Sequence, residues 1–212
     1  MRTLYGRANS SDVMKAVWLL EELGLPYERV DLGGPFGGTD APGYRAMNPN
    51  GVVPTLVEDG FVLWESNAIL RYLCDAHAPD HPLWPREPRA RASIDRWLDW
   101  QQTTLTRPQS IVFQGLIRTP PERRDGATIA TALVELGRVW GLLDARLARH
   151  AHVAGSEMSL ADVASGVSVH RWFALAMERP DLPHLRAWYD RLLARPAYAR
   201  PAYARHVAGP LS

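Results

Sequence analysis

The chain has 212 residues, with 24 lysines and arginines against 23 aspartates and glutamates, so its formal net charge is +1. This length accommodates one large domain or two small ones, and the charge balance argues against general binding to nucleic acid or to a membrane surface. No apolar run approaches the roughly 20 residues of a membrane span, and residues 1–6 lack the apolar core of a secretory signal. The single cysteine, Cys74, excludes an intramolecular disulfide and a cysteine-rich metal site, so we expect a cytoplasmic protein with no metal site.

The first eighty residues alternate between strand and helix patterns. Apolar residues recur at helical spacing from Val13 and stop at Gly24, a residue type typical of a helix C-terminus. Asp59-Gly60 stands between two apolar runs and is a strong hairpin signal. In chain order, we predict a strand at 2–5, a helix at 13–23, a strand at 26–32, a loop at 33–38, a helix at 41–47, strands at 52–57 and 61–64, and a helix at 65–77. This order predicts a small α/β domain with a mixed sheet.

The remainder of the chain is helical in pattern. Four prolines between Pro79 and Pro88 are typical of a linker. Helices are predicted at 89–105 and 128–147, and two more begin near Ser159 and Leu182. We therefore expect two domains, α/β at 1–80 and all-α at 88–212.

A short duplication lies near the C-terminal end, where residues 195–199 are repeated at once as 200–204. Two copies are too few for a solenoid. A proline inside a helix costs roughly 3 kcal/mol, so we expect one of the two prolines to open the terminal helix and the other copy to lie in a bend. We interpret the repeat as a neutral local duplication.

A proline stands at the start of a predicted strand, in Val53-Pro54. Proline removes a donor from the strand ladder, so its presence here suggests a special backbone such as a cis peptide. Such a bend would leave the backbone of Val53 free to pair with an extended peptide ligand. The alternative is an ordinary proline on an edge strand.

Two strand-to-helix turns carry polar residues that suit a charged ligand. At Glu65-Ser66 the exposed N–H groups and the positive end of the helix dipole favour a carboxylate, while Glu65 would accept from an ammonium group. Together they suit the head group of an α-amino acid. At Asn9–Asp12 a hydroxyl could donate to a thiolate and lower its pKa, with Arg7 adding to the positive field. Ordinary helix capping is the alternative for both turns.

The two polar turns and Val53-Pro54, together with the order of the predicted elements, resemble those of cytosolic glutathione S-transferases. The resemblance covers nearly the full length of the chain. The matching segments are Asn-Pro-Asn-Gly-Val-Val-Pro-Thr-Leu at 48–56 and Leu-Trp-Glu-Ser-Asn-Ala-Ile-Leu-Arg-Tyr-Leu at 63–73. Residues 4–7 and 115–121 look like a bacterial subgroup of serine type, similar to the theta and delta classes. The resemblance implies a thioredoxin-like N-terminal domain with a mixed four-stranded sheet, followed by an all-α domain that carries the electrophile site.

The resemblance also implies how glutathione would be bound. Pro54 would be the family's cis-proline, and Val53 would pair through its backbone with the cysteinyl part of glutathione. Glu65 and Ser66 would hold the γ-glutamyl head. Thr39 lies where some members contact the glycine end.

The same resemblance places the catalytic hydroxyl. In serine-type members it lies fourteen residues before the glycine that ends the first helix, which gives Ser10 here, with Ser11 nearly as suitable. Asn9 and Asp12 would contact the sulfur or the glutathione backbone.

This sequence departs from the family pattern in two places. Gly51 stands where related serine enzymes often carry a histidine, so the glycyl carboxylate needs another partner. The first turn has no cysteine, which argues against omega- and beta-type members, and catalysis by Tyr5 is a minor possibility.

Three further features lie outside the turns. Ser159 to Asp162 fits a capping box, and we interpret Asp162 as structural. The stretch Arg171-Trp172-Phe173 would line the electrophile site or pack in the core. Cys74 is expected to be a buried, inert thiol.

The implied activity is conjugation, in which bound glutathione thiolate attacks a small hydrophobic electrophile such as a halide, an epoxide or an activated alkene. Glutathione is then the co-substrate, no metal is involved, and a homodimer is expected because family members are usually twofold dimers. Two alternatives stay open: a glutathione-dependent disulfide or peroxide reductase, and a non-catalytic relative that keeps the fold for interaction.

Overall fold

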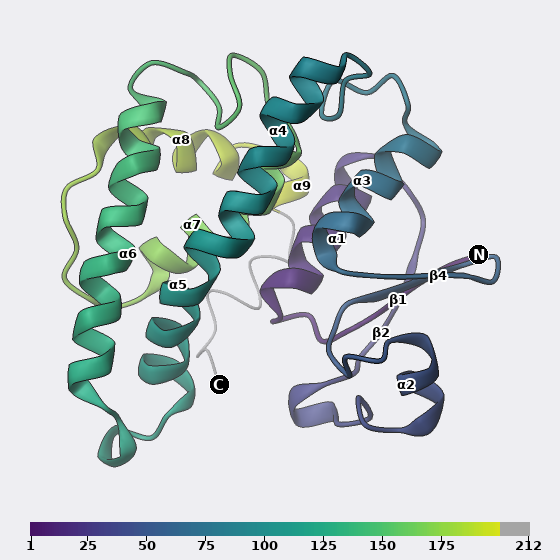
Figure 1. The fold of residues 1–212 in the computed structure, drawn as a ribbon, viewed down its shortest axis with the longest axis horizontal. Helices are drawn as coiled ribbons and strands as arrows, with labels where there is room; N and C mark the ends of the chain where they lie inside the picture. The colour runs from purple at the N-terminus through teal and green to yellow at the C-terminus, as the bar shows by residue number, and fades with distance from the viewer. Residues whose placement is uncertain (200–212) are drawn as a thin grey trace.

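The computed structural model describes residues 1–199, and its N-terminal part is built on a four-stranded sheet (Figure 1). The strand order is β2-β1-β3-β4. β1 (Arg2–Tyr5) pairs parallel with β2 (Glu28–Val30) and antiparallel with β3 (Thr55–Glu58), which pairs antiparallel with β4 (Phe61–Trp64). The sheet is therefore mixed, as predicted.

The helices of this part lie on both sides of the sheet. Figure 1 shows α1 (Ser11–Glu22) and α3 (Ser66–His77) on one side and the short α2 (Pro42–Met47) on the other. The loop at 33–38 contains one short 3-10 turn, Gly34–Phe36. α1 ends before Gly24, whose φ of +64° is readily adopted by glycine, and the β3–β4 turn has positive φ at both of its central residues, Asp59 and Gly60. The predicted helix end and hairpin are both confirmed.

The second part of the chain is all-helical, which confirms the predicted fold class. Its central helix, α7, is almost entirely buried and packs against α1, α4 and α8. The helices are α4 (Pro88–Trp100), α5 (Thr106–Phe113), α6 (Gly126–Leu147), α7 (Leu160–Ala174), α8 (Pro183–Leu193) and α9 (Pro196–Ala199), with a 3-10 turn at Pro121–Arg123.

The predicted helix at 89–105 is too short. After α4 the chain continues through a π-helical segment, Gln101–Leu105, into α5. A second π-helical segment follows α5 and ends at Arg118. The sequence did not predict this continuation because of Pro108, since a proline inside a helix lacks a donor and clashes with the carbonyl four residues earlier. The wider π turn before Pro108 accommodates that break in the hydrogen-bond ladder.

The start of α7 is stabilised by the predicted capping box. Asp162 is fully buried and accepts hydrogen bonds from the backbone N–H of Ser159 at 2.9 Å and of Val153 at 3.1 Å. The indole of Trp188 donates to the same carboxylate at 2.9 Å. These contacts hold α7, α8 and the preceding loop together, so the structural interpretation of Asp162 is confirmed.

Two features of the other helices bear on earlier expectations. By length and composition, α6 is the one helix in the described part of the chain that could cross a membrane, but its buried stripe, including Leu136 and Trp140, packs against α5 and α8 as in a core helix. Pro196 opens α9, as expected for one copy of the repeat, whereas residues 200–204 lie outside the described residues.

Candidate active site

A buried lysine joins the first turn of α1 to the start of α3. Lys15 is the only lysine of the sequence, and its side chain is 1% exposed. Its Nζ donates to Asp12 Oδ1 at 2.9 Å, to Ser66 Oγ at 3.3 Å and to Gln101 Oε1 at 2.8 Å. The Ser66 hydroxyl in turn donates to Asp12 Oδ1 at 2.9 Å. The network therefore links the two helix starts to the helical domain.

The same network sets the charge of Asp12. Burial on its own would raise the pKa of this carboxyl group. The ammonium group of Lys15 and the hydrogen bonds from Lys15 and Ser66 outweigh burial, so the pKa of Asp12 is lowered. Asp12 therefore carries a negative charge at neutral pH.

A cavity of about 240 Å³ lies between the start of α3, the segment before β3 and the helical domain. The Val53-Pro54 peptide bond on its wall is cis, as predicted. Glu65, which precedes α3, has φ +72°, a conformation that non-glycine residues rarely adopt and that is often found at functional sites. The cavity is lined by Asp12, Asn48, Val52, Val53, Pro54, Glu65, Ser66 and Gln102.

A smaller cavity of about 120 Å³ lies at the first turn of α1. Asp12 borders both cavities. Ser10 is the N-cap residue of α1, yet its hydroxyl makes no capping hydrogen bond to the helix. The lining consists of Arg7, Ser10, Ser11, Asp12, Ser110, Phe113, Gln114, Arg118 and Arg171.

Two of the predicted glutathione contacts line neither cavity. Asn9 lies just before the α1 turn, where its carbonyl accepts from Arg171 Nη2 at 2.9 Å and its buried Oδ1 has no partner within the described residues. Thr39 is half-buried in the loop before α2, beside Gly33. The other seven predicted site residues, Ser10, Ser11, Asp12, Val53, Pro54, Glu65 and Ser66, line one or both cavities.

The minor candidates, Tyr5 and residues 171–173, lie in different surroundings. Tyr5 packs edge-on against Tyr44, with ring centroids 6.4 Å apart, and borders neither cavity. Of the stretch 171–173, Arg171 reaches the smaller cavity, whereas Trp172 is buried in the core and Phe173 stacks on Tyr189.

The place expected for a partner of the glycyl carboxylate is occupied by an arginine. Gly51 has φ +63°, and a Cβ atom there would lie 2.5 Å from Arg45 Cζ. The Arg45 guanidinium donates to the carbonyl of Pro49 at 2.9 Å and to Asp40 at 2.6 Å. The bare glycine thus makes room for Arg45 beside the segment that leads to β3.

Sequence reasoning missed several residues that line the two cavities or belong to the hydrogen-bond network of Lys15. Lys15 left one usable signal, since a lone lysine interrupts the apolar stripe of α1 one turn after Asp12. Asn48, Val52 and Arg118 stand in segments that carry the family resemblance but were not predicted as site residues. The others carry no local signal and are brought to the site by folding; they are Gln101, Gln102, Ser110, Phe113 and Gln114.

The single cysteine lies outside both cavities. Cys74 is fully buried, and burial, with a contribution from Asp75, raises the pKa of its thiol to about 12, which makes the thiol inert as expected. Among residues 1–199, no group of three or more histidine, cysteine, aspartate and glutamate side chains could hold a metal ion.

The fold and the cavities define a two-domain protein in which a thioredoxin-like domain with a cis-proline is joined to an all-helical domain. Residues 2–75 match the family model of the glutathione S-transferase N-terminal domain, and residues 110–196 match that of the C-terminal domain. The chain belongs to the glutathione S-transferase family, which confirms the resemblance seen in the sequence.

Relatives and solved structures agree with this assignment. Glutathione S-transferase GstB of Escherichia coli K12 is 41% identical over 199 residues, which cover 93% of this chain and 95% of GstB. The theta class glutathione S-transferase of Xanthomonas axonopodis pv. citri, solved with glutathione bound, is 46% identical with a TM-score of 0.91, covering 100% of this chain and 99% of that one. A glutathione S-transferase of Pseudomonas fluorescens is 30% identical with a TM-score of 0.82, covering 92% and 96% of the two chains.

Proposed function

We propose that the protein is a glutathione transferase that activates the glutathione thiol at the α1 turn and conjugates it to small electrophiles. Its family and the names of its relatives support this function. The observation that carries it is that Asp12 borders both cavities, so a ligand held at Glu65 and Ser66 extends directly toward Ser10 and Ser11.

The larger cavity suits the γ-glutamyl head of glutathione. Asp12 and Glu65 offer carboxylates to its ammonium group, and the start of α3 offers backbone N–H groups to its carboxylate. The Ser66 hydroxyl already donates to Asp12, so Ser66 binds the ligand carboxylate through its backbone N–H.

The rest of the tripeptide would follow the segment before β3. Within the described residues the backbone of Val53 forms no hydrogen bond, which leaves it free to pair with the cysteinyl residue. The unpaired Oδ1 of Asn9 supports the proposed contact to the glutathione backbone. Thr39 remains the proposed contact at the glycine end, and Arg45 is a candidate partner for the glycyl carboxylate.

The chemical step needs a hydrogen bond to sulfur. In this proposal the Ser10 hydroxyl donates to the thiolate, and Ser11 is the alternative donor. The thiolate then attacks the electrophilic carbon: the S–C bond forms, and the bond to the leaving group breaks with its electron pair. A thiol pKa lowered by two units corresponds to about 2.7 kcal/mol of stabilisation of the thiolate.

The proposal extends to the setting of the enzyme. A cytoplasmic homodimer that detoxifies electrophiles, with glutathione as co-substrate and no need for a metal, nucleic acid or a membrane, fits the family and the balanced charge. Light scattering checks the dimer, and a monomeric mass at micromolar concentration would exclude it.

A pH titration of the thiolate absorbance of bound glutathione tests the function. We expect the pKa of the bound thiol to lie clearly below that of free glutathione, and Ser10→Ala to return it toward the free value. Ser11→Ala is the matched control and should leave the shift in place. Binding without a pKa shift, or no binding, would instead support a non-catalytic relative.

A further inference from the structure

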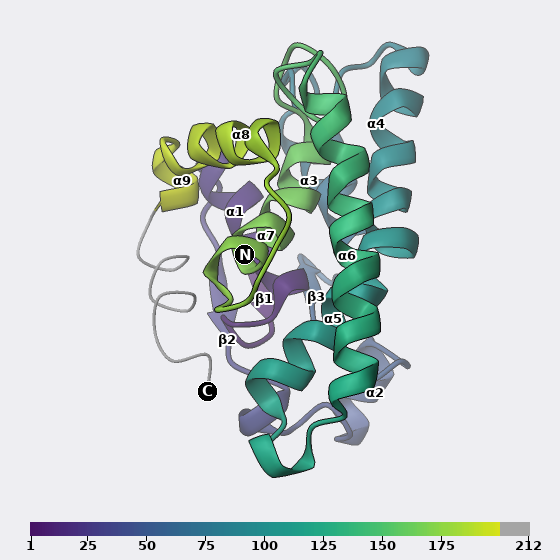
Figure 2. The ribbon, with the colours of Figure 1, turned by 90° about the vertical axis from the view of Figure 1, so that its left-hand side faces the viewer.

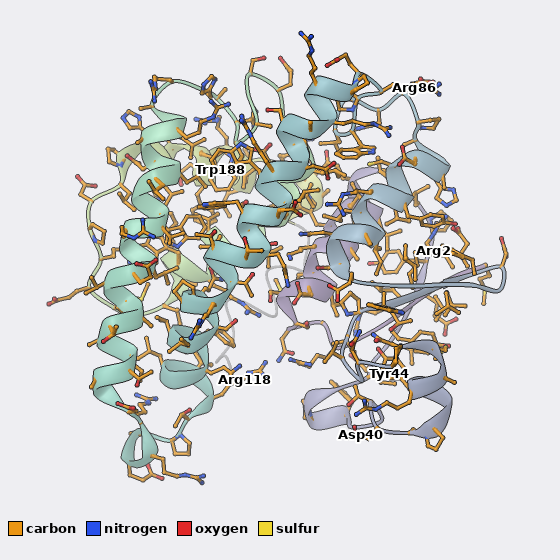
Figure 3. All side chains as sticks on the ribbon, in the orientation of Figure 1. Arg2, Asp40, Tyr44, Arg86, Arg118 and Trp188 are labelled. Atoms are coloured by element: carbon orange, nitrogen blue, oxygen red, sulfur yellow. The ribbon has the colours of Figure 1, made fainter. Side chains whose placement is uncertain are left out.

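Three arginines from distant parts of the chain surround the smaller cavity. Arg7 follows β1, Arg118 ends the π-helical segment behind α5, and Arg171 belongs to α7. Arg118 and Arg171 both lie over the ring of Phe113, with their guanidinium carbons 5.5 and 4.1 Å from its centroid. Figure 3 shows the Arg118 side chain projecting from the helical domain toward the N-terminal domain.

The positive charge of this cavity is poorly compensated by the protein. Within the described residues, neither Arg7 nor Arg118 forms an ion pair, and the buried Nε of Arg7 has no hydrogen-bond partner. Among residues 1–199, Asp12 is the one acidic residue that borders the cavity, and its Oδ1 already accepts from Lys15 and Ser66.

The arginines also act on one another. Burial and the nearby charge of Arg118 lower the pKa of Arg7, and the charge of Asp12 offsets only part of this effect. Arg171 is held at the domain junction by its hydrogen bond to the carbonyl of Asn9. An anion placed between the guanidinium groups of Arg7 and Arg118 would relieve their repulsion and accept hydrogen bonds from them.

We infer that the smaller cavity binds an anionic group of the electrophile, so that the preferred second substrates are small electrophiles bearing a carboxylate. This inference rests on the proposed function and narrows the expected class of hydrophobic electrophiles to those with a carboxylate. Phe113 contacts the apolar part of the electrophile, while Arg7 and Arg118 bind its carboxylate. In the reaction the sulfur displaces a leaving group such as a halide, which departs with the bonding electrons. The carboxylate is retained in the conjugate.

Binding of two product conjugates tests the inference by calorimetry. S-carboxymethylglutathione and S-carbamoylmethylglutathione have the same number of heavy atoms and lack a free thiol, but only the first adds a carboxylate. We expect the wild-type protein to bind the first about tenfold more tightly, the effect of one good charge-assisted contact. Arg118→Gln should remove most of this preference.

Arg107→Gln is the matched control, because it also removes one positive charge. Arg107 is exposed on α5 and does not line the smaller cavity. This variant should keep the preference, which excludes a long-range effect of net charge. A thermal melt shows whether Arg118→Gln is folded. If it is not, Arg118→Lys, which keeps the charge without the planar fork, should keep part of the preference.

The outcomes separate this inference from the proposed function. Equal affinity of the wild-type protein for the two conjugates would overturn the inference. The glutathione site would then stand. Failure to bind either conjugate or glutathione itself would overturn the proposed function.

Discussion

The ammonium group of Lys15 is removed from water where α1, α3 and the helical domain meet. A buried ammonium group without partners would be neutralised or strongly destabilising. Here three oxygens surround it, from Asp12, Ser66 and Gln101, and two of these residues border the larger cavity. Lys15 therefore holds residues of the site in place and itself lines neither cavity.

Replacing this lysine tests its positioning role. Lys15→Met should lower the free energy of unfolding by about 1–3 kcal/mol, since it leaves Asp12 and Gln101 without their donor. It should also weaken glutathione binding and raise the pKa of Asp12. The measurements are urea unfolding and calorimetric titration of glutathione.

The pH dependence adds a second check on Lys15. A lowered native pKa means that Asp12 stabilises the native state above its ordinary titration range and that this contribution is lost as the pH falls. The loss on acidification should be smaller in Lys15→Met. Unchanged glutathione affinity in a folded variant would show that Lys15 is only structural.

At the level of secondary-structure elements, the buried carboxylate of Glu58 connects β3 with β1 and α3. Glu58 of β3 accepts from the Tyr72 hydroxyl of α3 at 2.7 Å, lies 2.8 Å from His77 Nε2, and forms an ion pair with Arg2 of β1. Burial alone would raise the pKa of Glu58, but the hydrogen bonds from Tyr72 and His77 and the charge of Arg2 lower it. The cluster fixes α3, and with it Ser66, against the sheet.

Glu58→Gln is expected to reduce stability by about 1–3 kcal/mol near neutral pH, because it removes a charged acceptor from buried donors. Because the native pKa is lowered, this contribution is present above the ordinary titration range of a glutamate, and the difference from wild type should shrink as acidification protonates the native carboxylate. Urea unfolding as a function of pH measures this. Glu135→Gln is the control: its pair with Arg138 is exposed on α6, so the stability should change little. An equal loss of stability in both variants would show that burial of Glu58 is not the cause.

Across the whole molecule, the two domains share a continuous core. Trp18 of α1 is fully buried and lies edge-on to Tyr198 of α9, with ring centroids 4.6 Å apart, and the Tyr198 hydroxyl donates to the carbonyl of Gly166 at 2.7 Å. Figure 2 shows α1 close to α7, α8 and α9. Gly166 of α7 permits this approach, since a Cβ atom there would lie 2.6 Å from the Trp18 ring.

The interface therefore has little tolerance for added volume at one position. Gly166→Ala should destabilise the protein by about 1–3 kcal/mol through overpacking against Trp18, although alanine favours a helix more than glycine. Gly141→Ala in α6 is the matched control, because nothing lies within 4 Å of its added Cβ atom, and it should be neutral or stabilising by up to about 1 kcal/mol. Thermal unfolding compares the two, and equal melting temperatures would argue against close packing at Gly166.

Local chemistry made several features predictable. Gly24 and Asp59-Gly60 need backbone conformations that glycine adopts readily, and Ser159 with Asp162 satisfies donors within one helical turn, so each signal lies within a few residues. α5 escaped prediction because its proline is accommodated by an irregular turn, which has no simple residue pattern.

The sequence by itself determined the order of elements in the N-terminal domain, the two polar turns and the family. The tertiary structure alone decided which further residues join the two polar turns to form the cavities. Lys15 meets Ser66 and Gln101 across 51 and 86 residues of chain, and Arg7, Arg118 and Arg171 come from three separate parts of the chain. Periodicity reports which face of a helix is buried, but the partners found there depend on how the helices pack against one another.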